Sequence, residues 1–316
     1  MNILPALISM LLAVPGQSPD SGRVMAEDSL QAAMESTLDG LKWQSGKVSL
    51  MGGKMELALP EGYRYLDSGE TRKVIVDLWG NPSFAADNQM GMVFAPGQEP
   101  VGADSWSVVV SYDDQGHVDD KDAASINYDE LLTALQKSTE ESNLERQATG
   151  GRSLKLVGWA ERPTYDATAK TLFWAKEFEQ GDGERRLNYG VRILGREGIL
   201  SLSAVSRIGK LKEVKLGMND LFSFARFTPG NTYADFKSGD RISQAGLSVL
   251  VAGGAQVAAK SGLFKIVIGG IVAGKQFALL GFLLVLALLF FVYRRFFGKS
   301  DEGRFGTDMA DSPRPE

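Results

Sequence analysis

Residues 187–205 read LNYGVRILGREGILSLSAV and predict a β-hairpin. Every second residue from Leu187 to Ile193 is apolar, which is the spacing of one buried strand face. A second alternating run begins at Ile199, directly after the glycine-bounded GREG segment. Two alternating runs around a short turn with glycines are typical of paired antiparallel strands.

Working outward from this hairpin, the same alternation recurs along the chain. It predicts further strands at 55–59, 92–94, 105–112, 154–159 and 171–178, with a turn at 163–166 between the last two. Asn127 followed by Glu130 is a helix-capping pattern and predicts a helix over 127–145. Apolar residues at helical spacing predict a second helix over 207–222. Many short strands without strict strand–helix alternation favour an α+β fold with a mostly antiparallel sheet.

The first residues have the composition of a secretory signal peptide. An apolar run too short to span a bilayer extends to Val14, and Pro15, Gly16 and a polar stretch follow it. We therefore expect residues 1–16 to be a signal peptide. The alternative is an ordinary buried N-terminal helix.

Near the other end, residues 277–293 contain no charged residue, and basic residues flank them on both sides. This pattern predicts a transmembrane helix over 276–295, through which the protein would contact the lipid bilayer. The signal peptide and the basic residues after the helix both place the head, 23–240, outside the cytoplasm. The tail, 296–316, is expected to be disordered in the cytoplasm. This topology corresponds to a single-pass membrane protein.

Residues 241–275 are rich in glycine and alanine and connect the head to the predicted span. We expect a juxtamembrane helical segment at or against the membrane. A re-entrant pair or a second span is the alternative. Gly270 and Gly274 have the spacing that permits close helix approach, so a homo-oligomer is one outcome to consider.

The charge distribution excludes some classes of function. The 316-residue chain has a net charge of −5. Residues 242–293 contain three lysines and no acid, and 294–316 are neutral, so 1–241 carry −8. An acidic head argues against nucleic-acid binding, which needs a basic face. With one histidine and no cysteine, a cysteine-based zinc site, thiol chemistry and disulfides are excluded, and we expect no metal and no cofactor.

Clustered acids and aromatic residues provide the candidate ligand-binding site. The acids in 113–122 are dense, but they lack the spacing of a calcium loop. A solvated acidic turn and a weak cation site are therefore both considered. Aromatic rings beside carboxylates suit sugars or cationic groups, although turns use the same residue types for packing. The candidate ligand-binding residues are Trp79, Asn81, Asp119, Asp120, Asp122, Trp159, Tyr165 and Asp166. No catalytic residue can be assigned.

Several motifs resemble one bacterial family, the predicted membrane-anchored family called domain of unknown function 2167. The motifs that carry the resemblance are WGNP at 79–82, DDKDA at 119–123, NYDELL at 127–132, GWAE at 158–161, Pro163 with Tyr165-Asp166, LNY at 187–189, RILGR at 192–196 and YADF at 233–236. They occur in family order over roughly residues 40–295. The resemblance implies an exported domain on a C-terminal anchor and no established activity. In a bacterium, this topology places the anchor in the inner membrane, the head in the periplasm and the C-terminus in the cytoplasm.

Two functions remain open at this point. The first is a non-enzymatic periplasmic module that binds another envelope component, either a protein or a glycan. The second is a carboxylate-dependent periplasmic enzyme, similar to a glycan hydrolase, because paired acids can perform acid–base chemistry without histidine or cysteine.

Overall fold

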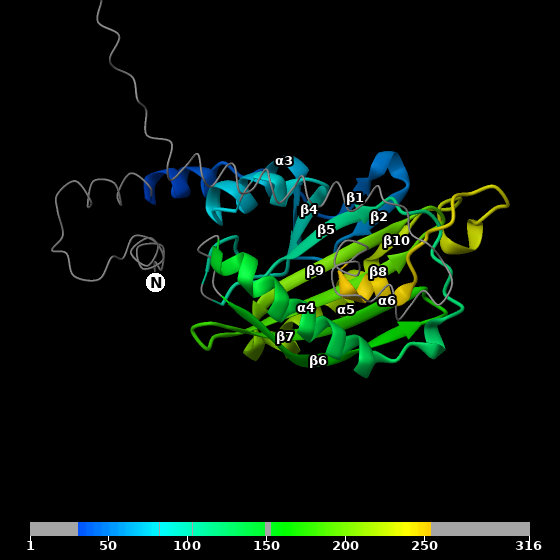
Figure 1. Ribbon diagram of the computed structural model, residues 1–316. Coiled ribbons are helices and arrows are strands. Elements are labelled where there is room, and N and C mark those ends of the chain that lie inside the picture. Colours follow the sequence, from blue (N-terminus) through cyan, green and yellow to red (C-terminus); the bar gives the residue numbers. More distant parts are fainter. Residues whose placement is uncertain (1–30, 82, 103, 149–152, 254–316) are drawn as a thin grey trace, which may run out of the picture. The chain divides into compact units, whose positions relative to one another are not determined.

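The computed structural model describes residues 31–253 except 82, 103 and 149–152 (Figure 1). The described residues all fall within one compact unit. The predicted signal peptide 1–16, the predicted span 276–295 and the predicted tail 296–316 lie outside them. Within the part that is described, no helix has both the length and the apolar character needed to cross a bilayer.

The fold is α+β and its sheets are antiparallel, as expected. The large sheet has seven strands in the order β3-β4-β5-β9-β8-β7-β6. These strands are β3 (Arg64–Asp67), β4 (Gln89–Phe94), β5 (Val108–Asp113), β6 (Leu154–Asp166), β7 (Thr171–Gln180), β8 (Arg185–Leu194) and β9 (Ile199–Arg207). A small sheet has the order β1-β2-β10, formed by β1 (Lys47–Leu50), β2 (Met55–Ala58) and β10 (Ala225–Phe227).

The predicted hairpin is confirmed as β8 and β9, which pair from Arg186↔Arg207 to Leu194↔Ile199. Packing against aromatic rings explains why glycines occupy the two ends of its turn. A Cβ on Gly195 would lie 2.5 Å from the Phe227 ring, and a Cβ on Gly198 would lie 2.4 Å from the Tyr112 hydroxyl. Both turn glycines are therefore covered by aromatic rings, which bury this end of the hairpin.

Helices cover the two faces of the large sheet (Figure 1). On one face, α5 (Leu211–Phe224) and the small sheet pack against Tyr189, Val191 and Leu202. On the other face, α4 (Tyr128–Ala148) and α6 (Leu247–Ala252) pack against Leu172 and Trp174. A third cluster joins the β3–β4 end to a helix at 31–39, α3 (Ser68–Arg72) and a following π-helical turn (Lys73–Leu78). The predicted helices over 127–145 and 207–222 correspond to α4 and α5.

Two elements differ from the sequence prediction. Residues 163–166 were expected to be a turn, but they belong to β6, which lies at the edge of the large sheet. Pro163 is tolerated there because an edge strand needs hydrogen-bond donors on one side only. The head was expected to end at 240, but the apolar packing continues to Ala252 because α6 lies on the sheet.

The β6 edge of the large sheet is blocked by α4. Asn143 accepts a hydrogen bond from the Leu154 N–H and donates one to the Leu154 carbonyl, both at 2.9 Å. Gln136 donates to the Leu156 and Val157 carbonyls at 3.2 Å. Side chains therefore occupy backbone groups that could otherwise pair with another strand, which is a common protection of edge strands.

Candidate functional site

Asp120 is the centre of a hydrogen-bonded cluster at one end of the large sheet. Its carboxylate accepts hydrogen bonds from Tyr165 at 2.6 Å, from Lys170 at 2.7 Å and from Tyr233 at 3.0 Å. Asp120 lies in the loop between β5 and α4, and Tyr165 lies in β6. Lys170 belongs to the β6–β7 turn, and Tyr233 to a short 3-10 helix (Tyr233–Asp235). We call these four residues the Asp120 cluster.

The Asp120 cluster keeps its acid ionised. Burial alone would raise the pKa of Asp120, but hydrogen bonds from Lys170, Tyr165 and Tyr233 outweigh it and hold the pKa at about 2. The side chain of Asp120 is 17% exposed and that of Lys170 is 31% exposed. Asp120 is therefore not a solvated turn residue, because its oxygens already have internal donors.

His117 and Arg196 extend this cluster into a junction between distant segments. The His117 ring lies between Tyr233 and Phe236, with both ring centroids at 4.2 Å. Arg196 donates two hydrogen bonds of 2.7 Å to Asp240. The chain after residue 232 is thereby fixed to the loops at this end of the sheet before it enters α6.

The other predicted acids are not part of the Asp120 cluster. Asp119 pairs with Lys121 at 2.9 Å and is 53% exposed, as a solvated turn residue would be. The Oδ1 atom of Asp122 is buried and has no hydrogen-bond partner. Burial raises the pKa of the Asp122 carboxyl. Asp166 accepts from the backbone N–H groups of Thr168 and Ala169 and closes the β6–β7 turn. No group of three or more His, Asp or Glu side chains in the described part of the chain is placed to hold a metal ion.

The predicted aromatic residues are separated from one another. Trp159 donates to the Tyr128 carbonyl at 3.2 Å and packs beneath α4. Trp79 donates to the Pro100 carbonyl at 2.8 Å, and Asn81 donates to the Ile75 carbonyl at 3.1 Å. These two residues close the helical turn after α3, close to the third core cluster. Of the eight candidates, the structure therefore brings together Asp120 and Tyr165.

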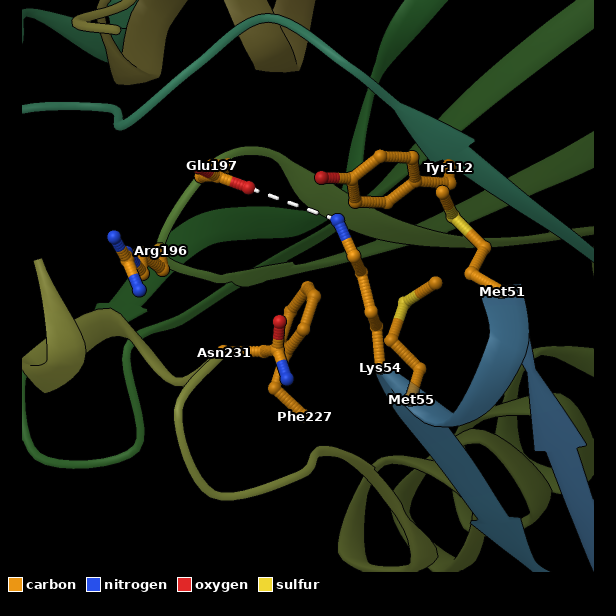
Figure 2. Close-up of a pocket in the computed structure, with 8 residues that line it drawn as sticks. All are labelled: Met51, Lys54, Met55, Tyr112, Arg196, Glu197, Phe227 and Asn231. Carbon is orange, nitrogen blue, oxygen red and sulfur yellow. Dashed lines mark ion pairs between the residues drawn. The ribbon is translucent and has the colours of Figure 1, made fainter. Parts of the chain in front are cut away.

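A small closed space lies between the β1–β2 hairpin and the β8–β9 turn (Figure 2). Lys54 and Glu197 form an ion pair of 3.7 Å across it. Its volume is about 10 Å³, which holds no more than one water molecule. This space lies where the two sheets meet, and it is too small for an organic ligand.

A larger open groove separates the small sheet from the large one. Its volume is about 420 Å³, within the range of ligand-binding clefts. We call it the β1 groove, and its lining residues are Gln44, Val48, Ser49, Leu50, Met51, Tyr65, Asp67, Ser68, Asn88, Gln89 and Met90. At one end the chain still pairs with β3 through Gln44 and Tyr65, and the groove opens where the chain leaves β3 to form β1.

The β1 strand presents an unpaired edge to this groove. β1 pairs only with β2 and is the outer strand of the small sheet. The Leu59 N–H donates to the Gly46 carbonyl, and hydrogen-bonded pairs alternate in an antiparallel ladder. The backbone N–H and C=O groups of Lys47 and Ser49 therefore point away from β2. Ser49 lines the groove and is exposed.

Two further features mark the β1 groove as unusual. Met51 and Asn88 have positive φ angles of 50° and 65°, and both line the groove. Such backbone conformations are uncommon outside glycine and concentrate at functional sites. Gln89 also lines the groove, and its Oε1 atom is buried without a hydrogen-bond partner. The sequence analysis missed this groove, although Met51-Gly52-Gly53 is a visible turn signal.

Comparison with known proteins identifies the family. Residues 42–293 match the family described as "Protein of unknown function (DUF2167)". The chain belongs to the DUF2167 family. Four of the motifs that carried the resemblance contribute to the Asp120 cluster and its extension: DDKDA, the Tyr165 segment, RILGR and YADF. These four DUF2167 motifs therefore meet in a junction whose polar groups bind one another.

The solved structures that this DUF2167 chain matches are distant from it in sequence and in structure. Cyanobacterial PsbP (CyanoP) from Synechocystis sp. PCC 6803 is 12% identical, with a TM-score of 0.34. The match covers 60% of this chain and 94% of the PsbP chain. The Ran-binding protein Mog1p of Saccharomyces cerevisiae is 10% identical, with coverages of 63% and 100% and a TM-score of 0.32. LpqN, involved in cell envelope biogenesis of Mycobacterium tuberculosis, is 13% identical, with coverages of 68% and 100% and a TM-score of 0.30. No curated protein matches the chain.

Proposed function

We propose that this DUF2167 protein is a non-enzymatic interaction module of the bacterial envelope. In this proposal the head lies in the periplasm, anchored in the inner membrane by residues 276–295. Its partner is an extended segment of another envelope protein, which adds a strand to β1 and fills the β1 groove. The unpaired edge of β1 beside an open groove is the observation that carries this proposal.

The chemistry of the groove suits a peptide backbone. A strand added to β1 would pair with the outward N–H and C=O groups of Ser49 and Lys47, as in other complexes formed by strand addition. Val48, Leu50 and Met90 offer apolar contacts. Asp67 is the charged residue of the lining, so a neutral or basic segment fits better than an acidic one.

The contrast between the β6 edge of the large sheet and the β1 edge of the small sheet supports the same proposal. At β6, side chains of α4 occupy the backbone groups of the edge strand. At β1, the backbone groups face an open groove. Edge strands favour unwanted association unless they are covered, so an uncovered edge beside a groove is consistent with a binding role.

A hydrolase has less support. A general acid needs a pKa near the working pH, whereas hydrogen bonds hold the pKa of Asp120 at about 2. Asp119 and Asp166 are engaged with Lys121 and with a turn of the backbone. The groove also lacks a pair of carboxylates, because Asp67 is its acidic lining residue.

A displayed library of random peptides, selected against the purified full-length chain, tests the proposal. We expect enriched peptides with alternating apolar residues. Their affinity should fall at least tenfold in Ser49→Pro, because proline removes the outward N–H without breaking the ladder to β2. Ser49→Ala retains that N–H and should bind like the parent.

Thermal unfolding of both variants provides the control for folding. Proline at an edge position should leave the unfolding midpoint within a few degrees of that of Ser49→Ala. The proposal is contradicted if no peptide is enriched, or if selected peptides bind a folded Ser49→Pro as well as they bind Ser49→Ala.

A further inference from the structure

Two cationic side chains, Lys176 and Arg192, lie on the face of the large sheet that α6 covers, opposite the small sheet. Trp174 and Lys176 project from β7 on this face, and Arg192 projects from the neighbouring strand β8. The Trp174 ring lies over Gly190, where a Cβ would be 2.8 Å from its Cζ2 atom. The ring of Trp174, from β7, therefore also covers the neighbouring strand β8 at Gly190.

Neither cation forms an ion pair with a carboxylate of the described residues. Lys176 is 8% exposed, and its ammonium donates to the Val251 carbonyl at 2.6 Å. Arg192 donates to neutral groups, the closest being the Val191 carbonyl at 2.9 Å. Asp113 accepts a hydrogen bond from Ser201 at 2.7 Å and lies beyond salt-bridge distance of Arg192.

Trp174 offsets only part of this charge. Its ring centroid is 5.1 Å from the Arg192 guanidinium carbon and 5.9 Å from the Lys176 nitrogen. Each cation–π contact returns less free energy than the desolvation of a buried charge costs. Trp174 is only 2% exposed, and its indole N–H is buried without a hydrogen-bond partner. The site therefore has an excess of hydrogen-bond donors and of positive charge.

The α6 helix covers these donors imperfectly. All six of its residues are buried, and the Val251 carbonyl is the acceptor that it offers to Lys176. The Ser248 hydroxyl, on the same helix, is also buried without a partner. Apolar packing thus favours the covered state, whereas two orphaned polar groups and two unpaired cations oppose it.

We propose that Lys176, Arg192 and Trp174 form a binding site for an oxyanion, and that the oxyanion replaces the Val251 carbonyl and releases α6 from the sheet. An oxyanion offers several acceptor oxygens and a negative charge, which are the two properties that the site lacks. Because α6 leads toward the predicted membrane anchor, binding at this site would change how the head is attached. The proposal does not depend on the β1 groove.

Inorganic phosphate and the purified full-length chain provide the test, at a pH of about 6, below the pKa of about 7 of Lys176, so that its side chain is protonated. Phosphate is expected to raise the thermal unfolding midpoint by several degrees in a saturable manner, beyond the effect of chloride at equal ionic strength. Hydrogen–deuterium exchange over 247–252 should increase at the same time, because α6 leaves the sheet. Vesicles containing phosphatidylglycerol, compared with phosphatidylcholine, show whether a lipid headgroup supplies the oxyanion instead.

Lys176→Met and Arg192→Met should each lose the response, and Lys121→Met, at an exposed lysine, should retain it. Arg192→Lys keeps the charge and is used if Arg192→Met does not fold; it should retain a weaker response. The proposal is overturned if neither phosphate nor the anionic vesicles shift the midpoint, if Lys176→Met responds like the parent, or if exchange over α6 stays unchanged on binding.

Discussion

Replacement of Asp120 by alanine is expected to lower the free energy of unfolding by about 3 kcal/mol, as when one partner of a largely buried ion pair is removed. The substitution leaves the Lys170 ammonium and the hydroxyls of Tyr165 and Tyr233 without their shared acceptor. These donors come from three separate segments, so the loss loosens the whole end of the sheet. Chemical denaturation of the full-length chain at pH 7 measures this effect.

Asp119→Ala is the matched control. Asp119 is the neighbouring acid, but its ion pair with Lys121 is exposed, so its loss should cost less than about 1 kcal/mol. The Asp120 contribution should also depend on pH. It is present above the ordinary carboxyl pKa of 3.8 and is lost as the pH falls through about 2. Equal destabilisation by the two substitutions would contradict the structural role of the Asp120 cluster.

The stability of the chain should rise with pH above neutrality because of Lys176. Burial, and secondarily the nearby Arg192, lower the pKa of Lys176 from 10.5 to about 7. Between these values the unfolded chain binds a proton that the folded chain does not, so stability increases with pH. Between pH 7 and about pH 9.5 we expect a gain of about 3 kcal/mol in the free energy of unfolding.

Lys176→Met should abolish this rise and should be at least as stable as the parent at pH 7, because it removes a buried charge. Burial raises the pKa values of Tyr63 and Tyr65 to about 12. These two tyrosines lower the free energy of unfolding only at about pH 10 and above, where tyrosines of the unfolded chain ionise, so they do not mask the effect of Lys176 below that pH. Denaturation curves at several pH values up to about 9.5 provide the measurement. A parent and a Lys176→Met variant with parallel pH profiles would show that the folded state holds Lys176 as an ordinary lysine.

Local patterns predicted the elements that are continuous in sequence. The β8–β9 hairpin, α4 and α5 each follow from periodicity and capping within one stretch. Pro163 was assigned to a turn because proline usually interrupts strands, and the assignment failed because β6 is an edge strand. A helical segment was expected within 241–275, but its start was not predicted to pack on the sheet as α6, because a short apolar segment before a predicted span has the composition of a membrane-adjacent helix.

The candidate sites are formed by contacts between residues far apart in sequence, which local sequence patterns cannot predict. Asp120 and Tyr165 were both selected, but their pairing joins residues that are 45 positions apart. The β1 groove forms between β1 and the ends of β3 and β4, and none of these strands has a binding motif. Lys176 did carry a signal, because it shares a strand face with Leu172 and Trp174, where alternation predicts a buried position.

Site-specific photo-crosslinking in living cells tests the proposed function most directly. A photoreactive amino acid at Ser49 would face the β1 groove, and the same residue at Lys121 would face solvent on the loop between β5 and α4. The proposal predicts one reproducible crosslinked protein from Ser49, absent from Lys121, which disappears when a selected groove-binding peptide is exported to the periplasm. No crosslink from Ser49, or the same products from both positions, would contradict a binding role for the groove.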